Sequence, residues 1–299
     1  MMDGILNINK ATGMTSHDVV AKVRKLLKQK RVGHAGTLDP AACGVLPICV
    51  GQGTRVAEYL SESGKAYQAE IIFGIVTDTY DREGITLRTA DTSSLTLTQI
   101  EEACLHFLGP QMQRPPRYSA IKLQGQPAYK RARAGEDITL EPRSVAFYQL
   151  QVLAWKPPQL TLAIDCSKGT YIRSLAYDLG EYLGCGAYLA ALMRTRSGPF
   201  SLSDSITLEQ LAEVFAQGKL QDVLFPSDSV LQQYPELRLD ATTVEHVLHG
   251  NAFRYSKHID SSMELARVYD PTGQFLAIAS WNAEQQTWQP KKVFTHHSL

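Results

Sequence analysis

The chain has 299 residues, 44% of them hydrophobic and 20% charged, and its 30 lysines and arginines balance its 30 aspartates and glutamates. This composition is typical of a soluble globular protein and excludes a disordered chain, while the length favours two domains. No run of about 18 apolar residues is present, and the first residues lack the basic and apolar regions of a signal peptide. We therefore expect a cytoplasmic protein without a membrane span.

The charges are unevenly distributed along the chain. Residues 22–31 contain six basic residues and no acidic one, and residues 114–143 contain seven basic against three acidic residues. Residues 201–240 contain seven acidic against two basic residues. Because a nucleic-acid backbone requires only a local density of Lys and Arg, the pattern predicts a basic face on a neutral protein. Solvated helix surfaces would produce the same pattern.

The five cysteines give no sign of a metal site. They are scattered along the chain, and no two of them have C-x-x-C spacing. We therefore expect buried thiols that act as small apolar side chains, and no metal.

The N-terminal part alternates between strands and helices. Ser16 is the expected N-cap of an amphipathic helix whose apolar residues recur at helical spacing up to Leu27. Residues 31–51 are rich in Gly and Pro but also apolar, which is typical of irregular buried backbone that lines a site. The other expected elements are strands at residues 5–9, 45–50 and 67–73 and a short helix at residues 54–60.

The sequence pattern of residues 98–183 predicts further helices and strands. Thr98 is the expected cap of a helix over residues 98–108, with Glu101 as its capping-box partner. The elements expected after it are helices at residues 129–134 and 171–183 and strands at residues 144–155 and 160–166.

Residues 235–299 have a different pattern from the rest. Short alternating strands, such as residues 266–269 and 276–281, flank a D-P-T-G turn. We therefore expect one domain over residues 1–234, with a basic insertion at about residues 114–143, and a small β-rich domain over residues 235–299.

Five motifs occur in order and together resemble one family. The segment G-H-A-G-T-L-D-P-A-A-C-G-V-L-P (33–47) resembles the catalytic loop of the TruB-type tRNA pseudouridine synthases. Ala35 and Cys43 stand where threonines are common in that loop, but no residue expected to be catalytic is missing. The other similar segments are N-K-A-T-G-M-T-S (9–16), F-G-I-V-T-D-T-Y-D-R-E-G (73–84), P-P-R-Y-S-A-I-K-L-Q-G-Q-P-A-Y (115–129) and C-S-K-G-T-Y-I-R-S-L-A-Y-D-L-G (166–180).

The resemblance implies a fold and a reaction. The fold would be α+β, with a mixed, largely antiparallel sheet, an RNA-gripping insertion and a C-terminal domain similar to PUA domains. The reaction would be the isomerisation of uridine 55 in the tRNA T arm to pseudouridine. No redox step or net hydrolysis occurs in that reaction, so we expect no cofactor.

Asp39 is the candidate nucleophile. A carboxylate is ionised at neutral pH and can add and leave, but a buried one costs several kcal/mol unless it is paired. The resemblance supplies Arg173 as that partner. Asp39 could attack the ribose C1′, add to the base C6 or remove a ribose proton, and the sequence does not decide among these routes. Without the motif, a turn or helix cap beside Pro40 would be the favoured explanation of Asp39.

The resemblance assigns roles to four other side chains. Tyr67 would stack on the uracil, Tyr171 would pack against the pocket, and Leu192 would form an apolar wall. His34 would fill the space that the flipped uridine leaves in the T loop. Taken alone, each of these residues would be explained as ordinary core or surface.

The remaining candidates would contact RNA phosphates. They are Lys10, the basic helix at residues 22–31, and Lys122, Arg131 and Arg133 in the insertion. Recognition should therefore depend on the shape of the T arm and a few bases. We expect a monomer without an obligatory protein partner.

Three alternatives remain open. Arg238-Leu239-Asp240 matches the R-L-D catalytic triplet of other pseudouridine synthase families, but it lacks the glycine expected after it. A non-catalytic tRNA-folding or RNA-binding protein could have the same fold. A guide-RNA-dependent catalytic subunit could share the motifs, although this chain lacks basic tails.

Overall fold

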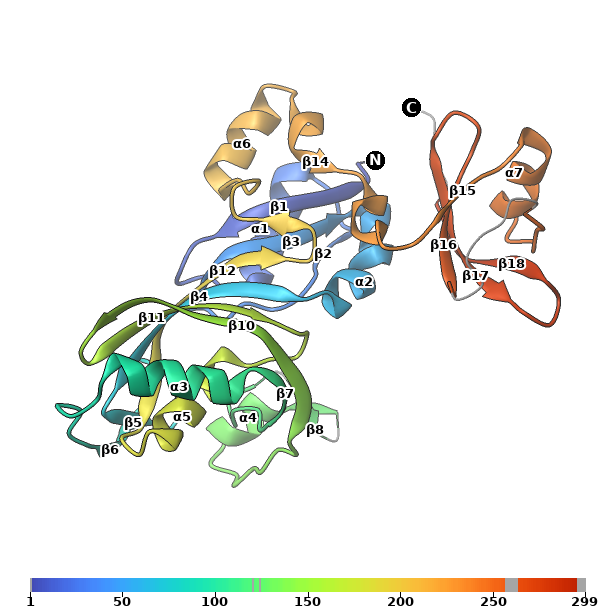
Figure 1. Cartoon of the computed structure of the whole chain (residues 1–299). Coiled ribbons are helices and arrows are strands. Elements are labelled where there is room, and N and C mark those ends of the chain that lie inside the picture. Colours follow the sequence, from blue (N-terminus) through green and yellow to red (C-terminus); the bar gives the residue numbers. More distant parts are fainter. Residues whose placement is uncertain (1, 120, 124, 256–262, 295–299) are drawn as a thin grey trace.

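The computed structural model describes residues 2–119, 121–123, 125–255 and 263–294. A large mixed sheet crosses the molecule, and a smaller sheet near the C-terminus stands beside it (Figure 1). In this described part, no helix is long and apolar enough to cross a membrane.

The large sheet has ten strands and confirms the expected mixed, largely antiparallel topology. β2 (Val32–His34) pairs with β3, and β13 (Phe200–Ser201) pairs with β12. In spatial order the other strands are β14 (Leu224–Phe225), β1 (Gly4–Lys10), β3 (Cys43–Val50), β12 (Ala187–Ser197), β4 (Lys65–Phe73), β11 (Gln159–Cys166), β10 (Arg143–Lys156) and β7 (Gly109–Gln113).

The two halves of this sheet meet where β3 and β12 run parallel. Only two residue pairs join them, Met193 with Cys43 and Arg194 with Gly44. Gly44 has a φ of +98°, and a Cβ there would lie 2.3 Å from the Arg194 carbonyl oxygen. The close approach therefore requires glycine. We call this contact the β3–β12 seam.

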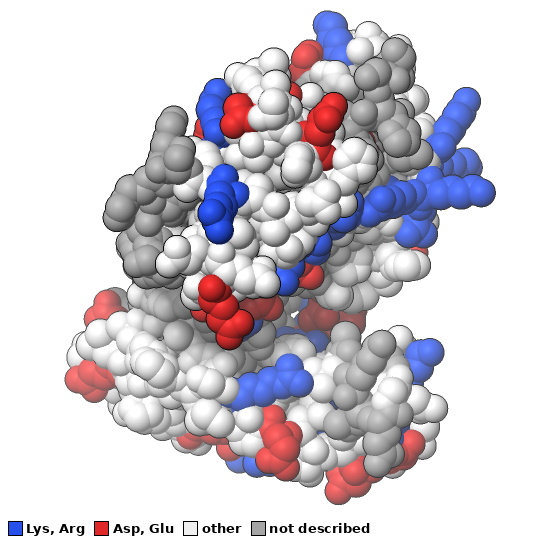
Figure 2. All heavy atoms as spheres, turned by 90° about the vertical axis from the view of Figure 1, so that its right-hand side faces the viewer, with Lys and Arg blue, Asp and Glu red and all other residues white. Residues whose placement is uncertain are grey.

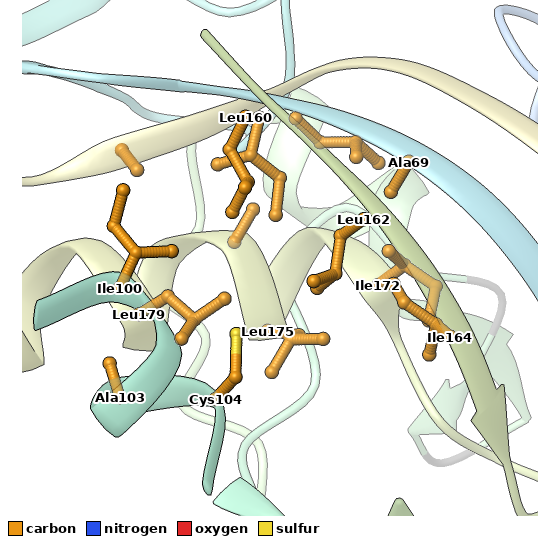
Figure 3. Packing of buried hydrophobic residues seen from close by; sticks show 14 of the residues in the cluster. Ala69, Ile100, Ala103, Cys104, Leu160, Leu162, Ile164, Ile172, Leu175 and Leu179 are labelled. Carbon is orange, nitrogen blue, oxygen red and sulfur yellow. The ribbon is translucent and has the colours of Figure 1, made fainter. Parts of the chain in front are cut away.

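Each half of the sheet has its own apolar core. On one half, α3 (Leu97–Phe107) and α5 (Ile172–Tyr182) cover the strands, and their apolar residues meet those of β11 (Figure 3). On the other half, α1 (Ser16–Leu27) packs on β1 and β3, with α6 (Leu208–Ala216) beside it. Fully burying one Leu or Ile contributes about 1.5–3 kcal/mol, so both halves have a substantial driving force to fold.

Two helices begin at different residues from those expected. Thr15, and not Ser16, caps α1 and forms a capping box with Asp18. Thr96, and not Thr98, caps α3 and forms a capping box with Gln99. The sequence offered two competent hydroxyl residues at each site, and packing of the apolar face decided which one precedes the helix.

Short elements connect these parts. η1 (Gly51–Val56) and α2 (Ala57–Glu62) lead into β4, and β5 (Ile75–Thr77) pairs with β6 (Thr86–Thr89). The insertion contains β8 (Lys122–Leu123), β9 (Gln126–Pro127) and α4 (Ala128–Arg133), with a small apolar cluster of its own. η2 (Leu220–Val223) and η3 (Ser227–Leu231) follow α6.

The small sheet packs against the large one. Its strands are β15 (Glu236–Arg238), β16 (Leu265–Tyr269), β17 (Phe275–Asn282) and β18 (Thr287–Val293), with α7 (Ala241–Leu248) against them. Arg55 lies 5.2 Å from the ring centre of Phe294, and Lys292 pairs with Glu58 at 2.6 Å. A shared apolar cluster lies beneath these contacts.

Candidate active site

A cavity of about 300 Å³ opens beside the β3–β12 seam. It is bounded by the loop that precedes β3, the first residues of β4, the start of α5, and β12. The expected site residues among its lining are Asp39, Tyr67, Tyr171, Arg173 and Leu192. Five of the residues chosen from sequence are thus brought together from four segments.

The loop that carries Asp39 is fixed from beneath by Ser16. The Ser16 hydroxyl accepts a hydrogen bond from the Leu38 amide at 2.8 Å and donates one to the Leu38 carbonyl oxygen at 3.1 Å. Leu38 is buried, whereas the Asp39 side chain is 46% exposed. The carboxylate therefore faces the cavity and is less buried than the apolar loop sequence indicated.

Lys10 also supports this loop, and its position corrects our expectation that it contacts phosphate. The residue is 0% exposed, and its ammonium donates to the carbonyl oxygens of Ala11, Met14 and Pro40 at 2.9, 2.8 and 3.4 Å. Burial lowers the pKa of Lys10. The side chain has no surface to offer to RNA, and it stabilises the turn that presents Asp39.

Arg194 holds the same loop from the side of β12. It is 0% exposed and donates to the carbonyl oxygen of Val45 at 2.6 Å, of Thr37 at 3.4 Å and of Gly36 at 3.3 Å. It also hydrogen-bonds Tyr67, although burial dominates and raises the pKa of that phenol to about 12. The Tyr67 hydroxyl is therefore protonated at neutral pH.

Arg173 connects the loop to the rest of the site. Its Nε lies 3.1 Å from Asp39 Oδ2, its Nη1 lies 3.4 Å from Asp81 Oδ2, and its Nη2 donates to the Tyr118 carbonyl oxygen at 3.0 Å. The guanidinium is 8% exposed. It therefore fixes the orientation of the Asp39 carboxylate by contacts on three sides.

Asp81 is a site residue that the sequence analysis missed. Its Oδ1 accepts hydrogen bonds from the Thr79 hydroxyl at 2.6 Å and from the Glu83 amide at 3.1 Å, which leaves Oδ2 for Arg173. Tyr80 before it has a φ of +63° and stacks on Tyr177 of α5 with ring centres 4.1 Å apart. The only available signal was the aspartate-rich turn at residues 77–84.

Tyr171 is positioned through its backbone. As the N-cap residue of α5, it accepts on its carbonyl oxygen from the Gln113 side chain at 3.0 Å, and its amide donates to Gln113 Oε1 at 2.8 Å. Burial raises the pKa of the Tyr171 phenol. Leu192 lies on β12 opposite Ala69 of β4 and lines the cavity wall.

His34 and Arg131, which were also predicted to contact RNA, lie outside the cavity lining. His34 ends β2, burial lowers its pKa, and its buried Nδ1 has no hydrogen-bond partner in the described part of the chain. Arg131 is paired with Glu136 at 2.6 Å on α4. Lys122 and Arg133 belong to β8 and α4, and their side chains lie outside the described residues.

Charge on the surface is uneven, as the sequence indicated. On the face turned to the viewer in Figure 2, several lysine and arginine side chains project together on the right, and acidic side chains are scattered elsewhere. The six basic residues of 22–31 are all exposed. Among residues 2–119, 121–123, 125–255 and 263–294, no group of three or more His, Cys, Asp or Glu side chains could hold a metal ion.

A carboxylate that faces a cavity and is oriented by an arginine beside a buried phenol is typical of an enzyme active site. Residues 24–172 match the model of the TruB family pseudouridylate synthase N-terminal domain. Residues 173–232 match that of the tRNA pseudouridylate synthase B C-terminal domain. The chain belongs to the TruB family of pseudouridylate synthases.

Individual relatives cover almost the whole chain. A protein named tRNA pseudouridine synthase B from Dehalococcoides mccartyi is 44% identical over 99% of this chain and 98% of its own length. One of the same name from Pseudomonas aeruginosa is 44% identical over 93% of this chain and 91% of its own. A chain in the crystal structure of a Cbf5-Nop10-Gar1 complex matches with a TM-score of 0.75 and 27% identity, over 98% of this chain and 85% of that chain.

Proposed function

We propose that this enzyme isomerises uridine 55 in the T arm of tRNA to pseudouridine, with Asp39 as the nucleophile. The observation that carries the proposal is the Asp39 carboxylate, which faces the cavity and lies 3.1 Å from Arg173 Nε. The relatives that match the whole chain are named as tRNA pseudouridine synthases, which supports tRNA as the substrate.

The flipped uracil would stack on Tyr67, with Tyr171 and Leu192 forming further walls of the cavity. The Asp39 carboxylate would then attack C1′, add to C6 or remove a ribose proton, and all three routes start from the ionised form. His34 would occupy the space left in the T loop. The exposed basic residues of 22–31, which lie at the end of α1 and just after it, and the insertion would contact phosphates.

We infer that the chain acts as a monomer in the cytoplasm and needs no protein partner, metal or cofactor. Residues 1–234 would form the catalytic domain, and residues 235–299 would form a PUA-like domain that extends the RNA contact. The matched family models end at residue 232, before the small sheet begins. Binding to the T arm without isomerisation would instead indicate a tRNA-folding protein.

The test is tritium release from C5-labelled uridine in an unmodified T-arm stem-loop, with the purified chain alone. Asp39→Asn should abolish release and change RNA affinity by less than about tenfold, because the carboxylate faces the cavity and contacts no phosphate. Release by Asp39→Asn, or none by the unaltered chain under conditions where it binds the stem-loop, would contradict the proposal.

A further inference from the structure

Two buried cations line the cavity besides Arg173. Lys65 is 9% exposed and Arg194 is 0% exposed. A Cβ built on Gly36 would lie 3.5 Å from Lys65 Cε and 3.7 Å from Arg194 Nη1, so both cations converge on the loop that carries Asp39. Within the ranges that the structure describes, neither has an aspartate or glutamate partner, whereas the neighbouring Arg196 is paired with Asp165 at 2.7 Å.

Lys65 has an N–H donor left for a ligand. Arg194 lies behind it and already donates from Nε to the Val45 carbonyl oxygen of β3 and from its terminal nitrogens to the carbonyl oxygens of Thr37 and Gly36, so most of its five N–H groups are occupied. The Lys65 ammonium has three N–H groups and donates to the carbonyl oxygens of Ser61 at 3.4 Å and Ser63 at 3.1 Å. A buried positive charge without a counter-charge is costly, so this corner of the cavity favours an anionic oxygen.

We propose that Lys65, with Arg194 behind it, binds the uracil carbonyl oxygen on which negative charge develops during the isomerisation. This inference rests on the proposed function. If the C1′–N1 bond breaks, its electron pair remains on the base, and uracil becomes an anion with charge on its carbonyl oxygens. If Asp39 instead adds to C6, the C5=C6 electron pair moves toward O4 as an enolate.

In both routes negative charge develops on a uracil carbonyl oxygen, which the proposal places beside Lys65. In the first route the bond from Asp39 to C1′ breaks as the new C1′–C5 bond forms, and in the second the bond from Asp39 to C6 breaks as the C5 proton leaves. In both routes C5 loses its proton to solvent and N1 gains one, so Asp39 returns to the free carboxylate. Lys65 supplies fixed charge and transfers no proton in this scheme. A preorganised donor aimed at developing charge is among the strongest catalytic devices available to an enzyme.

The position of Lys65 favours the base over a phosphate. Lys65 and Tyr67 are two residues apart on β4 and therefore point to the same face of the strand, where both line the cavity. Lys168, in contrast, has a side chain that is 53% exposed and is paired with Glu62. Phosphates of a bound stem-loop would meet exposed lysines before they met Lys65.

The charge state of Lys65 fits this role. Burial is the main cause that lowers its pKa to about 8, Arg194 and Arg196 lower it further, and Cys166 acts in the opposite direction. An adjacent oxyanion would favour the ammonium form. Free enzyme should therefore lose this positive charge as the pH rises through about 8.

The first test is Lys65→Met, which removes the charge and keeps the length of the side chain. Single-turnover tritium release should fall about 100-fold, while the Kd for the T-arm stem-loop changes by less than about threefold. Lys168→Met is the matched control and should release tritium at the rate of the unaltered chain. An unchanged rate, or an unchanged rate with a much weaker Kd, would overturn the inference, and the latter would indicate a phosphate contact.

The second test does not depend on whether Lys65→Met folds. It compares the pH dependence of kcat/KM in the unaltered chain and in Lys65→Arg. Lys65→Arg retains a positive charge at every accessible pH. Ionisation of the uridine itself affects both enzymes equally, so it does not contribute to a difference between their pH profiles. The fall of kcat/KM above about pH 8 should be present in the unaltered chain and absent in Lys65→Arg. Identical profiles would refute the role of Lys65, whereas failure of the unaltered chain to release tritium would refute the proposed function instead.

Discussion

Replacing Ser16 with alanine should disconnect α1 from the loop that carries Asp39. The Ser16 hydroxyl bonds both the amide and the carbonyl of buried Leu38, at 2.8 and 3.1 Å. Alanine would leave both backbone groups without a partner. Since each unsatisfied buried group costs about 1–3 kcal/mol, the free energy of unfolding should fall by roughly 2–6 kcal/mol.

Ser16→Ala should also slow catalysis by more than a loss of folded protein would explain. A displacement of about 1 Å at the nucleophile can reduce the rate about 100-fold, so single-turnover tritium release by Ser16→Ala should fall between about tenfold and 100-fold. The matched control is Thr15→Ala, which removes the cap of the same helix without touching the loop and should cost about 1 kcal/mol.

Three measurements would compare the two variants: the urea midpoint, the hydrogen exchange rate of the Leu38 amide, and the rate of tritium release. Ser16→Ala should be the less stable, with faster exchange at Leu38. Equal losses of stability in both variants, with the Leu38 amide still protected and release unchanged, would refute the reasoning.

Asp81 and Asp240 give opposite predictions for the rate of tritium release. Asp81→Asn weakens the orientation of Arg173, so tritium release should fall about tenfold or more while the Kd for RNA stays constant; a weaker Kd at an unchanged rate would contradict this. Hydrogen bonds from Thr242 and Thr243 lower the pKa of Asp240 to about 2. Because the unfolded value is near 3.9, this carboxylate stabilises the fold above about pH 4, and the contribution is lost as the pH falls toward about 2. Asp240→Asn should remove that part of the acid dependence of Tm and leave tritium release unchanged; loss of release would restore the R-L-D triplet as a candidate.

Elements with a clear apolar period were predictable from sequence. β4 appears where alternation indicated a strand, β1 covers the short strand expected at residues 5–9, and α5 begins one residue after Tyr171, which caps it. β4 and α5 each bury one regular face, so the periodicity of their side chains corresponds directly to their environment, whereas β1 is buried on both faces and reads as a short apolar run. In the R-L-D triplet Arg238-Leu239-Asp240, the aspartate is the N-cap of α7, where it accepts a hydrogen bond from the Thr243 amide at 2.8 Å.

The central strand β12 was not predictable, and the reason is Arg194. A strand that contains two arginines looks exposed, but Arg194 is buried because backbone carbonyls of a distant loop accept its hydrogen bonds. The position of Asp81 depends on the left-handed conformation of Tyr80 and on its stacking with Tyr177. Such partners are far apart in the chain, and a single sequence does not pair them.

The β3–β12 seam has a consequence for the order in which the enzyme becomes active during its synthesis. The loop with Asp39 is made early, but its partner Arg173 lies in α5, and the strand that joins the two halves of the sheet ends at Ser197. The core behind that loop also contains residues of α6, which come after Ser197 in the chain, so the loop gains its full packing and its partner Arg173 only late in synthesis. The cavity can therefore be complete only after most of the polypeptide has left the ribosome.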